Sequence, residues 1–374
     1  MTIDIDRAEQ IGFSPAPPPP RGRLSPAVGR ILGAVSDARG LKRLAVVLAT
    51  YIACMALFAL VVALQHASPW GVYDTLFRSA LVNDGALAEV LTRAVPISLA
   101  ALAVCIPARA GMVNVGGEGQ LIVGAVAACG VGVALGGKFP GPLGWVLMGL
   151  AGMAFGGAWA VVPALLRIKL AANEAVTTLL MNFVANDLML YLIYQPWKDP
   201  TGGGQPESRP LVGNMVLPNL GNSLTLSMLI ALAVAVGVWA LLQRTGWGFA
   251  LRVVGGNQDA ARRVGLPVQG LLVSSMLAGG ALAGLGGMLN LAGSQLQLVP
   301  GGTATYGYIG FLAAFLGRNQ PVKVVLAALV FSAIFIGNSG LELNYGLDGS
   351  VVDVLLALLV AAPLWLSRGR KEAF

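Results

Sequence analysis

Charged side chains, histidine and cysteine are all scarce in this sequence. Only 11% of the 374 residues are Asp, Glu, Lys or Arg, whereas soluble domains carry about 25%. Histidine occurs once, as His66, which argues against histidine-based metal sites and acid–base catalysis. Cys54, Cys105 and Cys129 stand in apolar runs and lack the spacing of a disulfide framework or a cysteine-based metal site. The composition therefore points away from soluble and metal-dependent protein classes.

Nucleotide-binding and catalytic motifs are also missing. The chain nowhere carries GxxxxGK[ST], the motif that cradles nucleotide phosphates. The run GGALAGLGG (279–287) is not followed by GK[ST], and its small residues are typical of helices that pack closely in a membrane. Intramembrane enzymes need a nucleophile with a histidine, a pair of aspartates or a metal set, and the single histidine argues against them.

Long apolar runs are what the sequence has in abundance. Apolar residues make up 56% of the chain, and the mean hydropathy is +0.76. These runs predict an all-α polytopic membrane protein rather than a β-barrel, with about ten transmembrane helices. The predicted spans lie near 44–65, 90–108, 111–134, 143–166, 175–194, 223–242, 270–291, 304–317, 322–338 and 350–366. The eighth and ninth are short and separated by GRNQP, so a single broken or re-entrant element is the alternative. The connection near 66–90 is predicted to hold a short amphipathic helix.

The N-terminal region has a different composition. Residues 1–43 contain PAPPPP (15–20) and several arginines, which predicts a disordered cytoplasmic tail with a basic end at the membrane surface. A ligand for a proline-recognition domain is the alternative. Residues 44–370 then form the predicted transmembrane domain.

The positive charges predict the orientation. With the N-terminus inside, the predicted cytoplasmic segments hold most of the 24 Lys and Arg residues, so both termini are expected in the cytoplasm. The first five and the last five spans would then run in opposite senses, as in an inverted 5+5 repeat with a pathway at its interface.

The predicted span 175–194 carries a polar stripe. Glu174, Thr178, Asn182 and Asn186 recur every four residues and so share one helix face, about 18 Å long. Asp187 is rotated from Asn186 by about 100°. Such a face must meet other helices or a watery path. Two interpretations stay open for Asn182 and Asn186, pathway-lining residues or interhelical hydrogen bonds, whereas Glu174 suits a structural or coupling role.

The stretch GMVNVGGEGQ (111–120) interrupts an apolar region with Asn114, Glu118, Gln120 and four glycines. If the third span begins near Gly111, Glu118 lies about 10 Å inside the helix. The glycines permit a broken helix or a close helix crossing, and a break frees backbone groups for a ligand or a charged side chain. We interpret Glu118 as a helix-positioning or gate residue rather than a catalytic acid.

Two tyrosines mark the segment VPGGTATYGYIGFLAAFLGRNQP (299–321). Tyr306 and Tyr308 are either interfacial anchors or stacking surfaces for a flat ligand at the mouth of a cavity. They complete the set of residues predicted to line a pathway across the membrane, which also contains Asn114, Glu118, Gln120, Thr178, Asn182 and Asn186.

The long inner connection contains GGNQDAARRVGL (255–266). Helix-forming residues from Gln258 to Val264 follow Asn257, which can cap a helix, and Gly265 can end it. This pattern predicts a short surface helix that is basic on one side. It is either a connector held by anionic lipid or a docking element for a cytosolic partner.

Several motifs in order resemble a known family. The pattern Gly256-Asn257-x-x-Ala260-Ala261-x-x-x-Gly265 resembles the cytoplasmic loop of ABC-importer permeases of the ribose and branched-chain amino acid type. RAGMVNVGGEGQLIVGA (109–125), NEAVTTLLMNFVA (173–185) and YGYIGFLAAFLGRNQP (306–321) resemble the branch that imports nucleosides, mostly purine ones, or simple sugars. The resemblance covers roughly residues 44–370.

This resemblance implies a permease of the bacterial inner membrane that does no chemistry and holds no cofactor. It implies a second, homologous permease in a heterodimer, cytosolic ATPase subunits that bind ATP and Mg, and an external substrate-binding protein. Lipid surrounds such a subunit, and no nucleic acid is involved. The ATPase-coupling loop would comprise Gly256, Asn257, Ala260, Ala261, Arg262, Arg263 and Gly265. The alternative is an ion-coupled secondary transporter, for which Glu118 and Asp187 are the only intramembrane carboxylates available.

Overall fold

The computed structural model describes residues 38–201, 204–221, 225–303 and 305–367. Residues 1–37 of the predicted tail lie outside them. The chain divides into a unit of residues 1–52, of which the start of one helix is described, and a unit of residues 53–374. The second unit contains the candidate functional residues.

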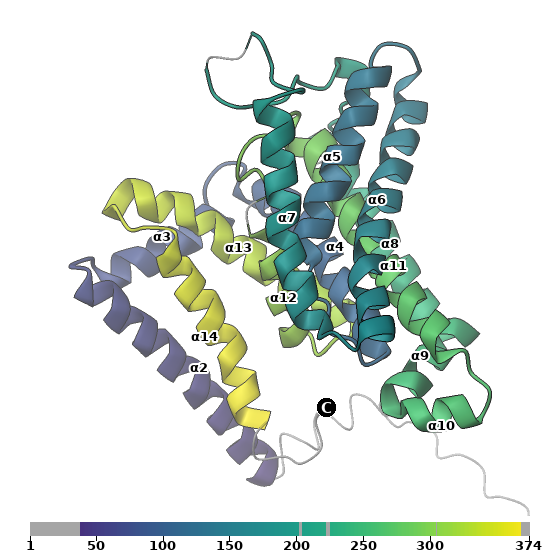
Figure 1. Ribbon diagram of the computed structural model, residues 1–374. Coiled ribbons are helices and arrows are strands. Elements are labelled where there is room, and N and C mark those ends of the chain that lie inside the picture. The colour runs from purple at the N-terminus through teal and green to yellow at the C-terminus, as the bar shows by residue number, and fades with distance from the viewer. Residues whose placement is uncertain (1–37, 202–203, 222–224, 304, 368–374) are drawn as a thin grey trace, which may run out of the picture. The chain divides into compact units, whose positions relative to one another are not determined.

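The described residues are helical, with two isolated β-bridges and no strand among them. Figure 1 shows the helices of the chain. They are α2 (Ala38–Leu64), α3 (Pro69–Leu81), α4 (Ala86–Arg109), α5 (Gly117–Leu135), α6 (Gly141–Leu170), α7 (Glu174–Tyr194), α8 (Leu226–Arg244), α9 (Gly246–Gly256), α10 (Gln258–Arg263), α11 (Val268–Asn290), α12 (Tyr306–Leu316), α13 (Pro321–Tyr345) and α14 (Ser350–Ser367). A 3-10 turn covers Gly213–Met215, and a π-turn, Leu291–Gln295, extends α11.

Eight helices of the described residues are long and apolar enough to cross a membrane. The chain is therefore an all-α, multi-pass membrane protein, as predicted. The eighth predicted span is α12, whose 11 residues reach about 17 Å, too short for a hydrocarbon core of about 30 Å. The ninth was expected to be short as well, and this is wrong, because α13 has 25 residues. Helix α14, at the tenth predicted span, has 18 residues.

Two local predictions from the sequence have clear outcomes. The amphipathic helix expected near 66–90 is α3, which begins at Pro69 after the capping residue Ser68. The third span does not begin near Gly111, because the chain is not helical between Arg109 and Gly117. We call residues 110–116 the first break. Its hydrogen bonds explain why α5 begins only at Gly117.

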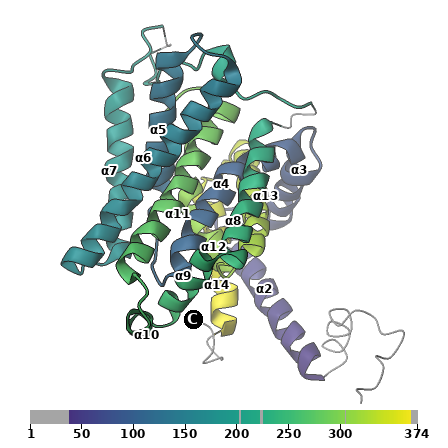
Figure 2. The same ribbon diagram turned by 90° about the vertical axis from the view of Figure 1, so that its right-hand side faces the viewer.

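Close backbone contacts between α5, α6 and α11 form the centre of the bundle. A Cβ atom built on Gly284 of α11 would overlap the carbonyl oxygen of Gly152 in α6, and one built on Gly124 of α5 would overlap Gly284. Only glycine permits these approaches, which confirms the packing role predicted for the run 279–287. In Figure 2, α7 stands at the outer side of α5 and α6. Helices α9 and α10 lie at one end of the unit, and the connection after α7 lies at the other.

The π-turn of α11 leads into a second non-helical stretch, which we call the second break (residues 296–303). The connection between α7 and α8 pairs with it through main-chain groups. Ser208 N donates to Leu298 O (2.9 Å), and Leu211 N donates to Leu296 O (2.8 Å). Helix α12 follows the second break and begins at Tyr306, which is buried.

Candidate functional site

The first break is shaped by one side chain, Asn114. Its Oδ1 accepts a hydrogen bond from Gly116 N (3.0 Å), a turn in which the side chain replaces a helical backbone acceptor. Its Nδ2 donates to Ala103 O of α4 (3.3 Å). Asn114 and Gln120 also exchange two amide hydrogen bonds, of 3.0 and 2.9 Å. These bonds hold the segment in a non-helical path until α5 begins at Gly117.

The polar stripe of α7 satisfies the backbone groups that the first break leaves without helical partners. Asn182 accepts from Gly119 N (2.8 Å) and donates to Val115 O (3.0 Å). Thr178 accepts from Val115 N (3.1 Å). Unpaired backbone groups at membrane depth are costly, so these side chains allow a broken helix to exist there. Asn182 Nδ2 also donates to the Tyr308 hydroxyl (3.2 Å), which ties α12 to the same cluster.

Glu174 connects the start of α7 to both neighbouring segments. Its Oε1 accepts from Val113 N (3.3 Å) and forms an ion pair with Arg167 near the end of α6. Asn173 caps α7 by accepting from Ala175 N (2.9 Å). The stripe therefore begins with a charged residue that is held by an arginine and by the first break. This agrees with the structural role considered for Glu174.

Glu118 lies where α5 and α12 begin side by side. Its side chain is buried, and its Oε2 accepts from Gly307 N (2.6 Å) in the first turn of α12. A helix N-terminus favours a negative group, so the carboxyl group stabilises the start of α12. A Cβ atom on Gly307 would overlap the backbone of Glu118, so only glycine fits there. Gly119 N donates to Asn182, which is the ninth residue of α7. Glu118, the neighbour of Gly119, therefore lies at a depth that corresponds to about 12 Å from the start of α7.

The predicted pathway residues fall into two groups. Five of them are 0–5% exposed and meet in one cluster, which Tyr308 joins through Asn182: Asn114, Glu118, Gln120, Thr178 and Asn182. Tyr306 is buried separately, with an edge-on contact to Phe335 and a hydrogen bond from Arg93. Asn186 is half-buried and forms no hydrogen bond within the described residues. The side chains of the cluster are buried, and its role in translocation stays a prediction.

The predicted surface helix of the inner connection is α10. Asn257 caps it by accepting from Asp259 N and Ala260 N, both at 3.0 Å. Gly265 follows its end with a φ of +83°, which favours glycine. Ala261 is buried, whereas Arg262 and Arg263 are exposed. The sequence pattern therefore predicted this helix and its two caps correctly.

A contact that the sequence did not indicate joins this helical connection to the first break. A Cβ atom on Gly255, near the end of α9, would overlap the carbonyl of Arg109 at the end of α4, and Gly111 lies beside Gly255. Arg109 also donates to Asn319 O (2.9 Å) in the turn between α12 and α13. No local pattern marks these positions, because each contact depends on residues far apart in the chain. A continuous series of packed backbone therefore runs from α9 to the cluster around Asn114.

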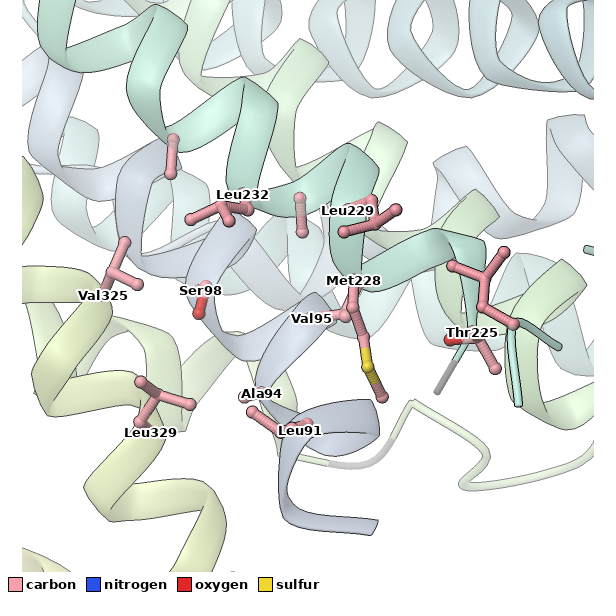
Figure 3. Close-up of a pocket in the computed structure, with 13 residues that line it drawn as sticks. Leu91, Ala94, Val95, Ser98, Thr225, Met228, Leu229, Leu232, Val325 and Leu329 are labelled. Atoms are coloured by element: carbon pink, nitrogen blue, oxygen red, sulfur yellow. The ribbon is translucent and has the colours of Figure 1, made fainter. Parts of the chain in front are cut away.

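A cavity among the described residues is apolar. It has a volume of about 270 Å³ and lies between α4, α8 and α13, as Figure 3 shows. Ser98 and Thr225 are the only polar residues in its lining, and leucines such as Leu91, Leu229 and Leu329 form much of its wall. A polar solute would find few hydrogen-bonding groups there. Within the described residues, no group of three or more His, Cys, Asp or Glu could hold a metal ion.

Comparison with known proteins gives a consistent result. The sequence profile of the family described as the permease component of branched-chain amino acid transport systems matches residues 86–363. The chain is 36% identical to a glucose ABC transporter permease of Haloferax volcanii, over 83% of this chain and 84% of that protein. It is 32% identical to a guanosine ABC transporter permease of Bacillus subtilis, over 86% and 92% respectively. It is 29% identical to a nucleoside ABC transporter permease of Lactococcus lactis, over 78% and 82%.

These relatives come in pairs. In each of the three organisms, a second permease named for the same solute also matches the chain, at 30% identity in Haloferax, 26% in Lactococcus and 26% in Bacillus. In all three organisms the second permease is less similar to this chain than the first. The chain therefore resembles one particular member of each pair.

Proposed function

The chain belongs to the family of permease components of branched-chain amino acid transport systems, and we propose on this premise that it is the permease subunit of an ABC importer for a nucleoside or a related simple sugar. The observation that carries the proposal is the match over residues 86–363, which includes most of the candidate spans. The chain is a transport component rather than an enzyme. The ion-coupled alternative receives no support from any relative.

The proposed solute is a neutral ring with several hydroxyl groups. Relatives are named for glucose, guanosine and nucleosides, and a hexose or ribose ring is what these solutes share. A purine nucleoside is the first solute to test, because the motifs at 109–125, 173–185 and 306–321 resemble a branch that imports nucleosides, mostly purine ones, or simple sugars. The permease itself would carry no cofactor, and ATP with Mg would bind to the partner ATPase.

The proposed assembly is a heterodimer with a second permease, together with cytosolic ATPase subunits and an external substrate-binding protein. The paired relatives support two different permeases. We place the complex in the bacterial inner membrane with both termini in the cytoplasm. The exposed Arg262 and Arg263 of α10 support this orientation, because basic connections are retained inside. The inverted 5+5 repeat remains part of the proposal.

In the proposed mechanism, α10 receives the motion of the ATPase. Gly255 and Arg109 then carry it to the first break, because their backbones are in contact. The first break is bonded to α7 through Thr178 and Asn182, so a shift of one displaces the other. Backbone segments that pack against one another and can adopt two arrangements can transmit such a motion.

Uptake measurements test the proposed function. The chain, its paired permease, the ATPase and the binding protein are reconstituted together in liposomes, and uptake of labelled guanosine and glucose is measured with and without ATP. We expect uptake of one of these solutes that requires ATP and all subunits. Uptake by the permease without the ATPase, driven by a proton or sodium gradient, would establish the ion-coupled mechanism instead.

The docking role of α10 has its own test. Arg262→Glu combined with Arg263→Glu reverses two exposed charges, one of which pairs with Asp259 within α10. We expect about tenfold less ATPase recovered with the permease, because the reversed charges would repel the acidic surface that the arginines are proposed to meet. The matched control reverses Lys198 and Arg209, which are exposed in the connection between α7 and α8. Unchanged ATPase recovery in the α10 variant would rule out the docking role.

A further inference from the structure

The side of α7 that points away from α5 and α6 has no partner among the described residues. We call it the outward face of α7; it consists of Leu180, Phe183, Asp187, Tyr191 and Tyr194. Its four apolar and aromatic members are 54–63% exposed. The opposite side of the same helix is buried at Thr178, Asn182, Ala185, Met189 and Ile193. Helix α7 packs against α5 and α6, and Thr178 and Asn182 of the buried side bond to residues 115–119.

Asp187 lies at the middle of the outward face. At 100° per residue it points about 140–180° away from Asn182 and Thr178, directly opposite the buried side. It is 13 residues beyond Glu174 and 7 before Tyr194, so it lies about 20 Å and 10 Å from the two ends of the span. It is exposed and has no hydrogen bond or ion pair within the described residues.

No other charged residue in the candidate spans is placed in this way. Among the eight candidate spans of the described residues, Asp187 alone is charged, exposed and outside the first and last two turns of its helix. Arg93 is also away from its helix end, but it is half-buried and bonded to Tyr306. Asp187 therefore stands out from the general rule that charges gather at the ends of spans.

Lipid is a poor environment for this face. An acidic side chain in the hydrocarbon region is costly, and Asp is too short to reach the headgroups from about 10 Å away. The side of α8 that carries Ala233 and Val236 gives the contrast, because these exposed residues are apolar and do not line the cavity between α4, α8 and α13. That side suits lipid, whereas the outward face of α7 requires protein and water around its centre.

We propose that the outward face of α7 contacts the second permease, and that Asp187 there accepts hydrogen bonds from solute hydroxyl groups in a water-filled path between the two subunits. This inference rests on the proposed function, and it names the group that recognises the solute. The second permease is the occupant because it is a membrane protein, it can cover the apolar part of the face, and each of three relatives has such a pair.

The chemistry of the face fits a ring with hydroxyl groups. A carboxylate has two acceptor oxygens and can take both hydroxyls of a vicinal diol, which ribose and glucose each present. Phe183 and Tyr191 lie one turn before and one turn after Asp187 and offer aromatic faces to the apolar side of a sugar or to a base. Asn186, beside Asp187, is half-buried and can both donate and accept.

Transport by the complete complex tests the hydroxyl contact. We measure uptake of guanosine and of 2′-deoxyguanosine at low concentration for the wild type, Asp187→Asn and Asp187→Leu. We expect Asp187→Leu to lower guanosine uptake about tenfold, which is the value of one charge-assisted hydrogen bond, and to reduce the preference for guanosine over its deoxy analogue. The control is Asp353→Asn, which alters another exposed carboxyl group near the start of α14. An unchanged preference in Asp187→Leu would overturn the proposed contact.

Chemical labelling tests the surroundings of the face independently of transport. In a background without Cys54, Cys105 and Cys129, Asp187→Cys in the complete complex is treated with a membrane-impermeant methanethiosulfonate. We expect labelling, and slower labelling in the presence of guanosine. Val236→Cys on α8, where the native valine is 56% exposed and lies outside the apolar cavity, is the control and should stay unlabelled in lipid.

The two experiments separate the inference from the proposed function. Failure of Asp187→Cys to label would overturn the water-filled path even if guanosine is imported. If the wild-type complex imports neither guanosine nor glucose, the proposed solute class is wrong, and the proposed contact between Asp187 and solute hydroxyl groups is wrong as well. In that case, labelling of Asp187→Cys and a Tyr194→Cys cross-link to the second permease would still support the interface, and absence of both would overturn it.

Discussion

The two breaks in the helical bundle are held by different kinds of bonds. The first break is held mainly by side chains, because Asn114, Thr178 and Asn182 bond to its backbone. The second break combines side-chain bonds with main-chain pairing to the connection between α7 and α8, where Ser208 N and Leu211 N donate to Leu298 O and Leu296 O. Side-chain bonds can be exchanged when a helix rotates, whereas a paired backbone moves as one piece. The first break, which also contacts α9 through Gly255, is therefore the better candidate for a moving part.

The largest loss of stability is expected for a substitution at Gly307. The start of α12 contacts the start of α5 at this residue. Gly307→Leu would force a side chain into the backbone of Glu118. We expect the free energy of unfolding to fall by about 3 kcal/mol or more, because overpacking against backbone cannot be relieved by a rotamer change. Thermal unfolding of the purified permease in detergent measures this. Gly237→Leu on α8, where a Cβ atom meets nothing within 4 Å, should be close to neutral.

Asn182→Leu tests the side-chain bonds of the first break. The change leaves Gly119 N and Val115 O without their partner, and each orphaned group costs about 1–3 kcal/mol. We expect lower thermal stability and strongly reduced solute uptake, with the complex still assembled. Asn186→Leu is the control for stability, since Asn186 has no hydrogen bond within the described residues. Unchanged uptake in the Asn182 variant would limit Asn182 to a packing role.

Ser208→Ala tests the second break and has the smallest expected effect. It removes the hydroxyl that accepts from Leu298 N (2.9 Å). The bonds from Ser208 N to Leu298 O and from Leu211 N to Leu296 O remain, so we expect a loss of only about 1 kcal/mol. Uptake should stay close to the wild-type value. A loss as large as that of Asn182→Leu would show that the two breaks are held in the same way.

Local signals in the sequence predicted much of the fold. Apolar length identified most of the spans, and the caps of α10 were visible because Asn257 and Gly265 act on their immediate neighbours. The start of α5 was predicted six residues too early, because its bonds to Ala103 and to α7 join distant segments. The polar stripe of α7 was recognised, but its bonding partners were not. Hydropathy also gave no sign that Gly255 meets Arg109.

The order of synthesis makes the first break a special problem for insertion into the membrane. Its backbone groups are paired by Thr178 and Asn182, about sixty residues later in the chain. Glu118 accepts its hydrogen bond from Gly307, which is 189 residues later. A membrane offers no water to pair these groups meanwhile. We therefore expect the start of α5 to remain near an aqueous boundary until α7 arrives, and to reach its final depth only when α12 is made. The bundle is thus completed by late rearrangement rather than one helix at a time.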